Sequence, residues 1–539
     1  MRGVERHGSV CMLEKIHIQN YRVFEQFKLD FRDGLNVLVG DNDSGKTTVL
    51  EAVHLALTSR LRGRLIANDL SPHLVNQAAA KRYLDSVRAG GNELPPEIVI
   101  DLYLEEREET AFLKGTNNTA MENACGLRVR MYFSQDFSDE YRRLLENPEE
   151  IRLVPTEYYR LEWRSFAGNA VTARSVPLSL SYIDASSIRL QSGADRYVEQ
   201  IINQQLDPAE RAELARAYRM LRETFADDAA IQAINARLSE SQGDLTDKEL
   251  SLSVDVSQKA SWESNLVPHL DDLPFQYIGS GHQAALKILL ALQQSADHCH
   301  VILIEEPENH QSPTSLGILI RKIAERCEDM QVVSTTHSSF VLNKLGLDRL
   351  ILIGRETGLP INGLPPETLE YFKKLPGYET LRAVLAKRVI LVEGPSDELV
   401  VQRAYLDAHD CLPSEDGVAV LTCGLSFERF LSITRPLDIP TVVVTDNDGR
   451  DPQQVRDKYE ALGAVSVHVG ELDGGRTLEP QIVSANELAT LNGLFGTDHA
   501  DGEELCAYME SNKTVCALAI FETESGCKLP SYLADAVTK

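Results

Sequence analysis

The stretch "LNVLVGDNDSGKTT", residues 35–48, sets the architecture of the first half of the chain. A short apolar run predicts a buried strand. It leads into a loop that fits G-x-x-x-x-G-K-[ST] from Gly40 to Thr47, and a helix is expected from about Lys46 to Ser59. In this order, loop amides and the helix N-terminus surround phosphate oxygens, the lysine reaches the outer phosphates and the threonine binds Mg²⁺. The stretch therefore predicts an ATP site with one Mg²⁺. Its expected ligands are Gly40, Asn42, Ser44, Gly45, Lys46, Thr47 and Thr48.

A second apolar run, "VILIEE" at residues 301–306, ends on two adjacent glutamates. Two carboxylates at the end of a buried strand are costly unless they serve an ion. We expect Glu305 to order the water shell of Mg²⁺ and Glu306 to orient the attacking water. The next predicted strand, "QVVSTTH", ends on His337. A lone histidine is more often a packed or surface residue than a functional one.

Length and composition place the chain among globular proteins. With 539 residues it is too long for one core and suggests two or three domains, and its 43% hydrophobic and 25% charged content is typical of globular chains. No apolar run approaches the roughly 18 residues that span a bilayer. Residues 1–12 lack the apolar centre of a secretory signal and are expected to be a loose leader. The sequence thus predicts no membrane partner.

Cysteine usage and net charge narrow the setting. Nine cysteines without a C-x-x-C pair suit a reducing cytoplasm and argue against structural zinc. The formal net charge of −27 repels nucleic acid at long range, so any DNA contact must come from local basic patches or bound cations.

The middle of the chain changes character twice. Residues 13–31 alternate in period two and predict a hairpin, and short β-rich runs between about 97 and 190 predict an antiparallel sheet. Residues 195–245 look helical, with an N-cap and capping box at 207–210. An apolar stripe follows at helical spacing. It indicates either a core-facing helix or a dimerisation insert, and we favour the insert because it interrupts a β-rich region. The stripe consists of Leu214, Tyr218, Leu221 and Phe225.

A proline- and glycine-rich stretch from Arg355 to Glu379 is the best candidate for a domain linker. Beyond it, "RVILVEG", "VAVLTCG" and "TVVVTDN" alternate with helical patterns, which predicts a small parallel sheet. The expected organisation is a leader at 1–12, an ATPase first part at 13–194, a helical insert at 195–255, an ATPase second part at 256–380 and a last domain at 381–539.

The tripeptide Asp-Asn-Asp occurs twice, at 41–43 and 446–448. The first copy lies inside the phosphate-binding loop, where its acids are spacers. The second ends a predicted parallel strand of the sheet whose neighbouring strand ends at Glu393, and ligands gather at the carboxyl ends of such strands. Two carboxylates about 4 Å apart repel by roughly 4 kcal/mol at an effective dielectric constant of about 20, and divalent ions remove that penalty. The sequence therefore predicts a Mg²⁺ or Mn²⁺ site. Its expected ligands are Glu393, Asp397, Asp446 and Asp448.

The first half resembles the ATP-binding-cassette ATPases of the structural-maintenance and RecF type. Ser280, Gly281 and Gln283 match the signature loop of that family, whereas Gly279 and His282 depart from it. Because the signature completes the site of a second subunit, the resemblance implies a homodimer, or a tetramer made of two such dimers. His337 resembles the switch histidine that senses the γ-phosphate.

The last domain resembles Toprim, and the order of the two halves resembles the OLD (overcoming lysogenization defect) nucleases, including the nuclease subunit of Gabija-type antiphage systems. The resemblance implies a cytoplasmic, ATP-gated DNA endonuclease with two Mg²⁺ or Mn²⁺ ions, and a helicase or another defence protein as a possible partner. It adds Glu479 as a further metal ligand and Lys513 beside the scissile phosphate. The catalytic residues it implies are Glu306, His337, Glu393, Asp446 and Lys513.

Two other functions stay open from sequence. The first is a RecF-like clamp or recruitment protein whose Toprim domain binds DNA without cutting it. The second is a primase or topoisomerase, although the chain shows neither zinc-binding cysteines nor a recognisable nucleophilic tyrosine on a separate domain. The predicted fold class is α/β, with a RecF/SMC-like ABC ATPase carrying a helical dimerisation insert, followed by a Toprim domain.

Overall fold

The computed structural model describes residues 13–61, 64–173, 175–185, 206–241, 269–293, 300–326, 330–374, 378–523 and 526–538. The expected leader at 1–12 lies outside these residues. The chain forms two compact units, one spanning Pro177–Ser334 and the other Met12–Val176 with Thr335–Lys539. Each unit is described by itself below.

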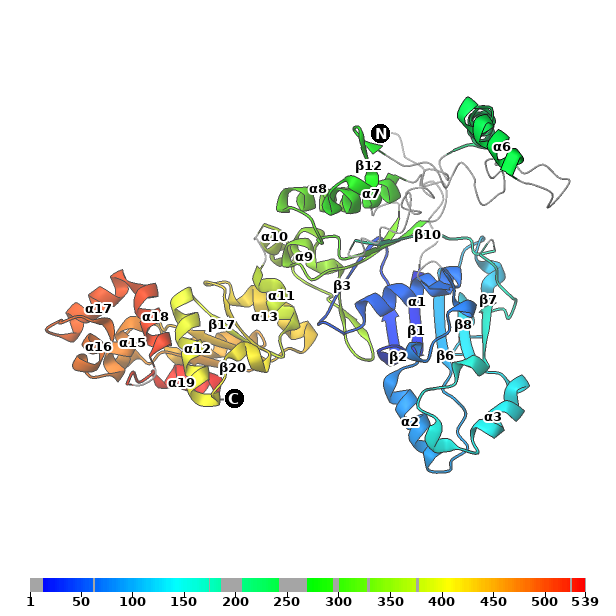
Figure 1. The fold of residues 1–539 in the computed structure, drawn as a ribbon. Helices are drawn as coiled ribbons and strands as arrows, with labels where there is room; N and C mark the ends of the chain where they lie inside the picture. The colour runs from blue at the N-terminus through cyan, green and yellow to red at the C-terminus, as the bar shows by residue number, and fades with distance from the viewer. Residues whose placement is uncertain are drawn as a thin grey trace, which may run out of the picture. The chain divides into compact units, whose positions relative to one another are not determined.

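An antiparallel sheet occupies the first part of the larger unit (Figure 1). Its strand order is β2-β1-β6-β8-β7, with β9 paired to β8. Ile16 and Ile18 on β1 lie opposite Leu29 and Phe27 on β2, and all four are buried, which confirms the predicted hairpin. The strands are β1 Leu13–Tyr21, β2 Phe24–Asp30, β6 Ile98–Leu104, β7 Lys114–Gly115, β8 Ala124–Phe133 and β9 Tyr159–Ser165.

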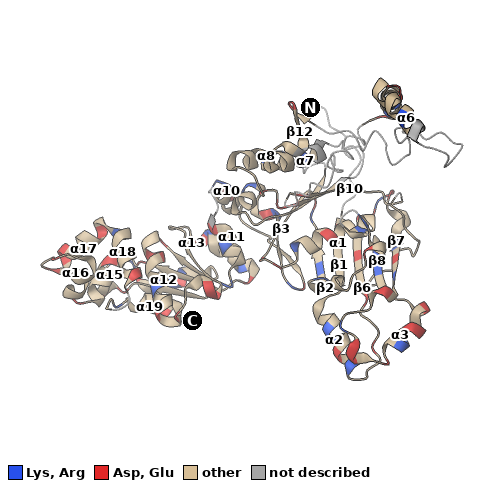
Figure 2. Ribbon diagram, in the orientation of Figure 1, with Lys and Arg blue, Asp and Glu red and all other residues tan. Residues whose placement is uncertain are grey.

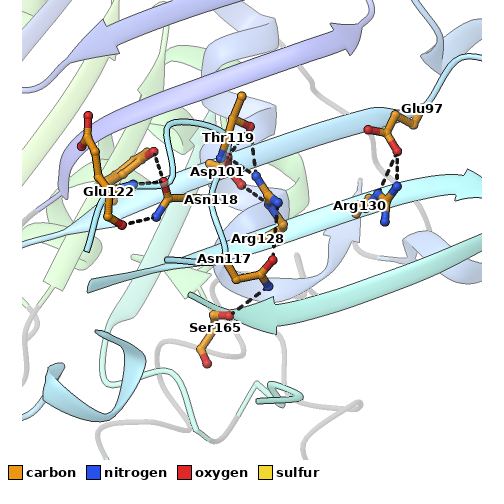
Figure 3. Close-up of polar contacts among 10 residues, drawn as sticks. Glu97, Asp101, Asn117, Asn118, Thr119, Glu122, Arg128, Arg130 and Ser165 are labelled. Carbon is orange, nitrogen blue, oxygen red and sulfur yellow. Dashed lines mark hydrogen bonds and ion pairs between the residues drawn. The ribbon is translucent and has the colours of Figure 1, made fainter. Parts of the chain in front are cut away.

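A buried ion pair ties a loop to this sheet (Figure 3). Asp101 is fully buried on β6 and accepts two hydrogen bonds from the guanidinium of Arg128 on β8, at 2.6 and 2.7 Å. Its carboxylate also accepts the backbone N–H and the hydroxyl of Thr119, at 2.7 and 2.6 Å. A buried charge is tolerated only when it is paired and hydrogen-bonded. We therefore assign Asp101, Arg128 and Thr119 a structural role and do not treat them as a candidate site.

The phosphate-loop strand β3 (Leu35–Val39) lies parallel to β15 (Leu350–Ile353), which pairs antiparallel with β16 (Gly358–Pro360). The stretch predicted as a linker, 355–379, is therefore folded, since it contains β16 and α10 (Pro366–Lys374). Phe372 on α10 is buried against Phe430, with ring centroids 5.2 Å apart. The prolines misled the prediction because one ends an edge strand and another opens a helix, both positions that need no backbone N–H. The other elements of this part are α1 Lys46–Thr58, β4 Arg60–Leu61, β5 Arg64–Leu65, α2 Gln77–Arg88, α3 Ser138–Leu144, β14 Gln331–Thr335 (at the border of the two units), α9 Ser339–Leu345 and α11 Tyr378–Leu385.

In the smaller unit, β10 (Ser179–Asp184) pairs parallel with β13 (His300–Glu305), placing Asp184 opposite Glu305. The sequence grouped this strand with the antiparallel sheet, and that prediction is wrong. More than 100 residues separate the two strands, enough chain for the crossover that a parallel pair requires. The remaining elements here are α5 Pro208–Ala226, α6 Ala229–Ser241, β11 His269–Leu270, β12 Leu273–Pro274, α7 Ser280–Gln293 and α8 Pro313–Arg326.

Helix α5 begins with the predicted capping box. The Asp207 carboxylate accepts the N–H of Ala209 and Glu210 at 2.7 and 2.8 Å, and Glu210 in turn accepts the Asp207 N–H at 2.9 Å. Leu221 and Phe225 of the apolar stripe are 66% and 55% exposed. The stripe is thus not buried against the described part of its own chain, and dimerisation through it stays a prediction.

The C-terminal domain is built on a four-stranded sheet of order β18-β17-β19-β20 (Figure 1). All three pairings are parallel, which confirms the predicted α/β class and small parallel sheet. Helix α12 packs against both α18 and α19, and the core between these layers is apolar. The strands are β17 Arg388–Val392, β18 Val418–Thr422, β19 Thr441–Thr445 and β20 Ser466–Val469. The helices are α12 Pro395–His409, α13 Phe427–Thr434, α14 Pro452–Ala461, α15 Leu478–Ala485, α16 Leu488–Phe495, α17 Gly502–Ser511, α18 Lys513–Glu522 and α19 Ser531–Val537.

Charge is unevenly distributed in this domain. Residues 477–512, which include α15 to α17, contain seven Asp and Glu and no Lys or Arg (Figure 2). Over the residues that the structure describes, no helix is both long and apolar enough to cross a bilayer.

Candidate nucleotide and metal sites

The phosphate loop is held in shape by its own lysine. The Lys46 ammonium donates to the carbonyl oxygens of Gly40 and Asp41, at 2.8 Å each. Gly45, the N-cap of α1, has φ +101, and a Cβ there would lie 2.3 Å from a ring carbon of Phe24. A side chain is excluded at this position by both the backbone conformation and the contact, so only glycine lets the loop turn into the helix.

The loop side chains fit a phosphate ligand. The buried hydroxyl of Ser44 has no hydrogen-bond partner among the described residues, and Thr47 is exposed in the first turn of α1. Asp41 and Asp43 point to solvent, as expected of spacers, and Asn42 is exposed beside them. Thr48 is buried in the helix. An orphaned hydroxyl at a helix N-terminus suits an anion, which the loop amides and the helix dipole attract.

The acidic strand lies in the smaller unit. Glu305, the last residue of β13, is buried and accepts a hydrogen bond from the Tyr182 hydroxyl at 2.8 Å. Glu306 follows with φ +48, and its carboxylate accepts from the Asn309 amide at 2.6 Å. The two glutamates therefore have different neighbours: Glu305 is bonded to Tyr182 on β10, and Glu306 to Asn309 in the loop after β13.

The signature segment packs beside the loop that follows this strand. Ser280 opens α7, and a Cβ at Gly281 would lie 2.2 Å from the carbonyl oxygen of His310. The Gln311 amide donates to the Gly281 carbonyl at 2.6 Å. Gln283 is buried and donates to the carbonyls of Phe275 and Ile278, so it shapes the turn before α7.

His337 belongs to the larger unit, with the phosphate loop. The preceding residue, Thr336, follows β14 and donates its N–H to the carbonyl of Leu38 at 3.2 Å. The chain just after β14 therefore lies beside β3. His337 itself is exposed. Because Glu305, Glu306 and the signature lie in the other unit, the closing of all these groups around one nucleotide stays a prediction.

Glu393 and Asp446 meet at one edge of the C-terminal sheet. They follow the neighbouring strands β17 and β19. The Glu393 carboxylate accepts the N–H of Asp446 at 3.1 Å and also the hydroxyl of Thr445. This fixes Glu393 across two strand ends, as parallel pairing allows.

Two of the acids have strongly perturbed pKa values. Burial raises the pKa of Asp446 to about 8, and the charges of Asp397 and Glu393 add to the shift. Burial also raises the pKa of Asp397 to about 6, although the hydrogen bond from the Gly394 N–H, at 3.0 Å, opposes it. Raised pKa values from desolvation and like charges are typical of functional sites that receive a cation.

Glu479 supplies a buried carboxylate from α15. Its Oε1 pairs with the Lys513 ammonium at 3.0 Å, whereas its Oε2 is buried without a hydrogen-bond partner among the described residues. Burial would lower the pKa of Lys513, but the hydrogen bond to Glu479 and the charges of Glu479, Asp446 and Asp397 together outweigh it and raise the pKa. A buried carboxylate oxygen without a protein partner, close to other acids, is suited to bind a divalent cation, because hard cations such as Mg²⁺ prefer oxygen ligands.

Asp448 lies at the rim of the same edge. It has φ +50, its N–H donates to the carbonyl of Arg476 at 3.2 Å, and its carboxylate accepts from Arg450 at 2.6 Å. The Arg476 side chain lies against Gly449. Two arginines that the sequence did not single out therefore flank this acid.

These acids do not form a finished ligand shell. In the described part of the chain, no three His, Cys, Asp or Glu side chains are arranged as a metal site. Three of the carboxylates are instead tied to a side-chain donor: Glu393 to Thr445, Glu479 to Lys513 and Asp448 to Arg450. Their charges contribute to the raised pKa of Asp446, and binding a cation requires side chains to turn away from these donors.

Asn447, between the two aspartates, was missed by sequence and organises the edge. It is fully buried and donates to the carbonyls of Gly470 and Gly475, at 3.0 and 2.7 Å, and of Glu471 at 3.3 Å. Its own oxygen accepts the Gly449 N–H at 2.7 Å. The only signal in the sequence was an amide inside a tight turn, because its partners lie more than 20 residues away.

Comparisons with known proteins follow the same division of the chain. Three protein-family models match the chain. The family model of an AAA domain matches residues 15–108, and the family model of an AAA ATPase domain matches residues 187–342. The family model of the overcoming lysogenization defect protein-like TOPRIM domain matches residues 384–448. The fold and site thus define a class: an ABC/AAA-type ATPase joined to a C-terminal Toprim domain.

Within that class, the chain is homologous to OLD nucleases over most of its length. It is 23% identical over 467 residues to the OLD nuclease of Thermus scotoductus, covering 81% of this chain and 82% of that protein. It is 21% identical over 478 residues to endonuclease GajA of Bacillus cereus, covering 83% and 77%. The solved C-terminal region of the Burkholderia pseudomallei OLD protein aligns at 21% identity and a TM-score of 0.24, covering 28% of this chain and 95% of that one.

Proposed function

We propose that the protein is an ATP-binding, divalent-metal-dependent DNA endonuclease of the OLD type. The observation that carries the proposal is the gathering of Glu393, Asp397, Asp446 and Glu479 at the carboxyl edge of one parallel sheet. Burial and mutual repulsion raise the pKa of Asp446 there to about 8. Such a cluster is stable with its charges only when cations bind.

The residues present fit Mg²⁺ or Mn²⁺. All candidate donors are carboxylate oxygens, the buried Glu479 Oε2 has no described protein partner, and no cysteine or histidine belongs to the set. When bound, a pair of such ions would activate water and stabilise the leaving oxygen of a phosphodiester. Lys513, half exposed at the edge, would neutralise charge that develops on the phosphate.

DNA is the proposed substrate, although the chain carries net charge −27. The basic side chains Arg450, Arg476 and Lys513 lie at the rim of the acidic edge, beyond the stretch 477–512 that has none. Phosphates would be attracted to these side chains and to bound cations and repelled from α15 to α17.

The nucleotide half would regulate cutting through a homodimer. The signature residues Ser280, Gly281 and Gln283 would complete the nucleotide site of a second subunit. Glu306 would orient the attacking water, and His337 would sense the γ-phosphate. A tetramer made of two such dimers, and a helicase or other defence protein as partner, belong to the same proposal. The six described cysteines are free thiols, which supports the reducing cytoplasm as its compartment.

Incubation of supercoiled plasmid with the full-length protein and Mg²⁺ or Mn²⁺, with and without ATP, tests the proposal. The parent is expected to nick or linearise the plasmid, and Glu393→Gln is expected to abolish cutting while it still binds ATP. Intact plasmid under every metal and nucleotide condition would contradict the assignment.

A DNA-binding clamp without cleavage is the second candidate. It is favoured by the absence, within the described residues, of a finished metal site and by the ion pair between Asp448 and Arg450. In the same assay a clamp retards the plasmid on a gel without nicking or linearising it.

A further inference from the structure

The last helix, α19, is firmly attached to the C-terminal domain. The Arg388 guanidinium donates to the carbonyl of Ala536 at 3.0 Å, and a ring nitrogen of His409 lies 2.9 Å from the carbonyl of Val537. The helix packs on α12 and on strands β19 and β20 (Figure 1). A segment outside the sequence motifs is therefore part of the domain that carries the acids.

Tyr532 on α19 presents an unusual polar atom. The side chain is only 6% exposed and belongs to the apolar core of the domain. Its hydroxyl is buried and has no hydrogen-bond partner among the residues that the structure describes. Since a buried hydroxyl without a partner is costly, phenylalanine would suit this position better if packing were its only role.

Helix α19 packs on β19, the strand that ends directly before Asp446, so the acidic edge lies near Tyr532. The pKa of Tyr532 is raised well above its usual value, first by burial and then by Asp446, Asp397, Glu393 and Glu479. These are the acids of the candidate metal centre. The charges that act on the hydroxyl are those of carboxylates, so it stays protonated and is available as a hydrogen-bond donor.

We infer that Tyr532 is a positioning residue of the metal centre: its hydroxyl hydrogen-bonds to a buried water molecule that bridges it to the carboxylates and the cation they hold. The inference rests on the proposed metal-dependent function. A buried polar atom with no protein partner is normally satisfied by an ordered water or ion, and a polar pocket lined by several oxygens can hold one. Groups in this outer position orient the ligands and set the affinity of the cation.

Tyr405 provides a matched control. It belongs to the same core cluster and is almost equally buried at 4% exposure, but its hydroxyl donates to Asp416 at 2.8 Å. Its pKa is raised by burial first and then by Asp416 and Cys411, which do not belong to the candidate metal centre. Tyr532→Phe and Tyr405→Phe are thus the same chemical change, near the centre and away from it.

The test is made on the full-length protein with three readouts: Mn²⁺ affinity by calorimetry, Tb³⁺ emission excited through tyrosine, and the thermal unfolding midpoint in EDTA. Tyr532→Phe is expected to weaken Mn²⁺ binding about tenfold and to reduce the sensitised Tb³⁺ emission. Its unfolding midpoint in EDTA should equal or exceed that of the parent, because an unpartnered hydroxyl has been removed. Tyr405→Phe should bind both ions like the parent and unfold at a lower temperature, because it loses a made hydrogen bond.

Parental Mn²⁺ affinity and Tb³⁺ emission in Tyr532→Phe would overturn the inference, even if the parent cuts DNA. Equal weakening of Mn²⁺ binding in both variants would overturn it as well, because the effect would then be a general loss of core packing. If the parent fails to cut DNA, the proposed function is wrong, and the affinity and emission measurements still decide the role of Tyr532.

Discussion

Asp446 has a more strongly raised pKa than the neighbouring Asp397. Its pKa is raised to about 8 by burial and by Asp397 and Glu393, whereas the unfolded chain titrates near the ordinary value of 3.8. Between these two values the folded state without metal holds a proton that the unfolded state has released. The free energy of unfolding therefore decreases as pH rises through this window.

This predicts a pH dependence that is specific to one residue. In EDTA, the thermal midpoint of the parent should fall relative to that of Asp446→Asn as the pH is raised from 5 to about 8.5. Saturating Mn²⁺ should remove the difference for the parent, because the cation replaces the proton. Parallel midpoint curves for the two proteins in EDTA would show that Asp446 is not perturbed.

Lys46 and Lys513 allow a crossed test of the two halves. Lys46→Ala should weaken ATP binding by about tenfold or more, because it removes a charged donor that reaches phosphate and holds the Gly40 and Asp41 carbonyls. Lys513→Ala should leave ATP affinity unchanged and reduce DNA cleavage. Titration with a fluorescent ATP analogue, together with the plasmid assay, measures both effects. Loss of ATP binding in Lys513→Ala would contradict this division.

Among individual residues, the sequence predicted the roles of those that belong to a local motif. Glu393 and Asp446 could be paired in advance because both end strands of one parallel sheet. The roles of Asn447 and Tyr532 could not be predicted in this way. The nearest carbonyl that Asn447 binds across the edge lies 23 residues further along the chain, and Tyr532 lies more than 80 residues beyond Asp448. Arg450 beside Asp448 was within reach of the sequence, but nothing in the pattern distinguished it from a solvated arginine.

The turn after β19 shows how an element positions the site. Asn447 bonds to three carbonyls from the 470–475 loop and accepts a fourth hydrogen bond from Gly449. These bonds join the ends of β19 and β20 and direct Asp446 and Asp448 to the same edge. The geometry of the acids therefore depends on a residue that binds no ligand itself.

Asn447→Ala should lower the free energy of unfolding by about 3 kcal/mol, because buried carbonyls lose their donor. Mn²⁺ affinity should fall with it, as the turn relaxes. Gln453→Ala, which removes an exposed amide near the start of α14, should change stability by no more than about 0.5 kcal/mol. Denaturant unfolding of both variants measures the difference, and equal stabilities would show that the amide does not hold the turn.

Elements defined by strong local pattern were predicted well, whereas their partners were not. The helix after the phosphate loop and the capping box at Asp207 were readable because the signals lie within a few residues. The pairing of β10 with β13 and the folded stretch 355–379 were misread. Strand partners depend on chain topology, and prolines at an edge strand or a helix start resemble prolines in a linker.

The whole molecule is expected to work as a dimer through its helical insert. Helix α5 exposes Met220, Leu221 and Phe225, an apolar surface that the described part of its own chain does not cover. Light scattering after size exclusion should show that Leu221→Lys with Phe225→Lys lowers the molar mass to that of one chain. The matched control Leu472→Lys, also at an exposed apolar position, should leave the mass unchanged. An unchanged mass for the double variant would place the interface elsewhere.

The proposed function assigns ATP binding to the first half of the chain and DNA cleavage to the C-terminal domain. The cleavage part depends most directly on cation binding at Glu393, Asp397, Asp446 and Glu479. Electron paramagnetic resonance of free Mn²⁺, titrated with full-length protein in the absence of nucleotide, counts the bound ions. We expect one or two ions for each parent chain and loss of this uptake in Asp446→Asn, with ATP binding intact in both. Equal uptake by the two proteins, or none by the parent, would contradict the proposed metal centre.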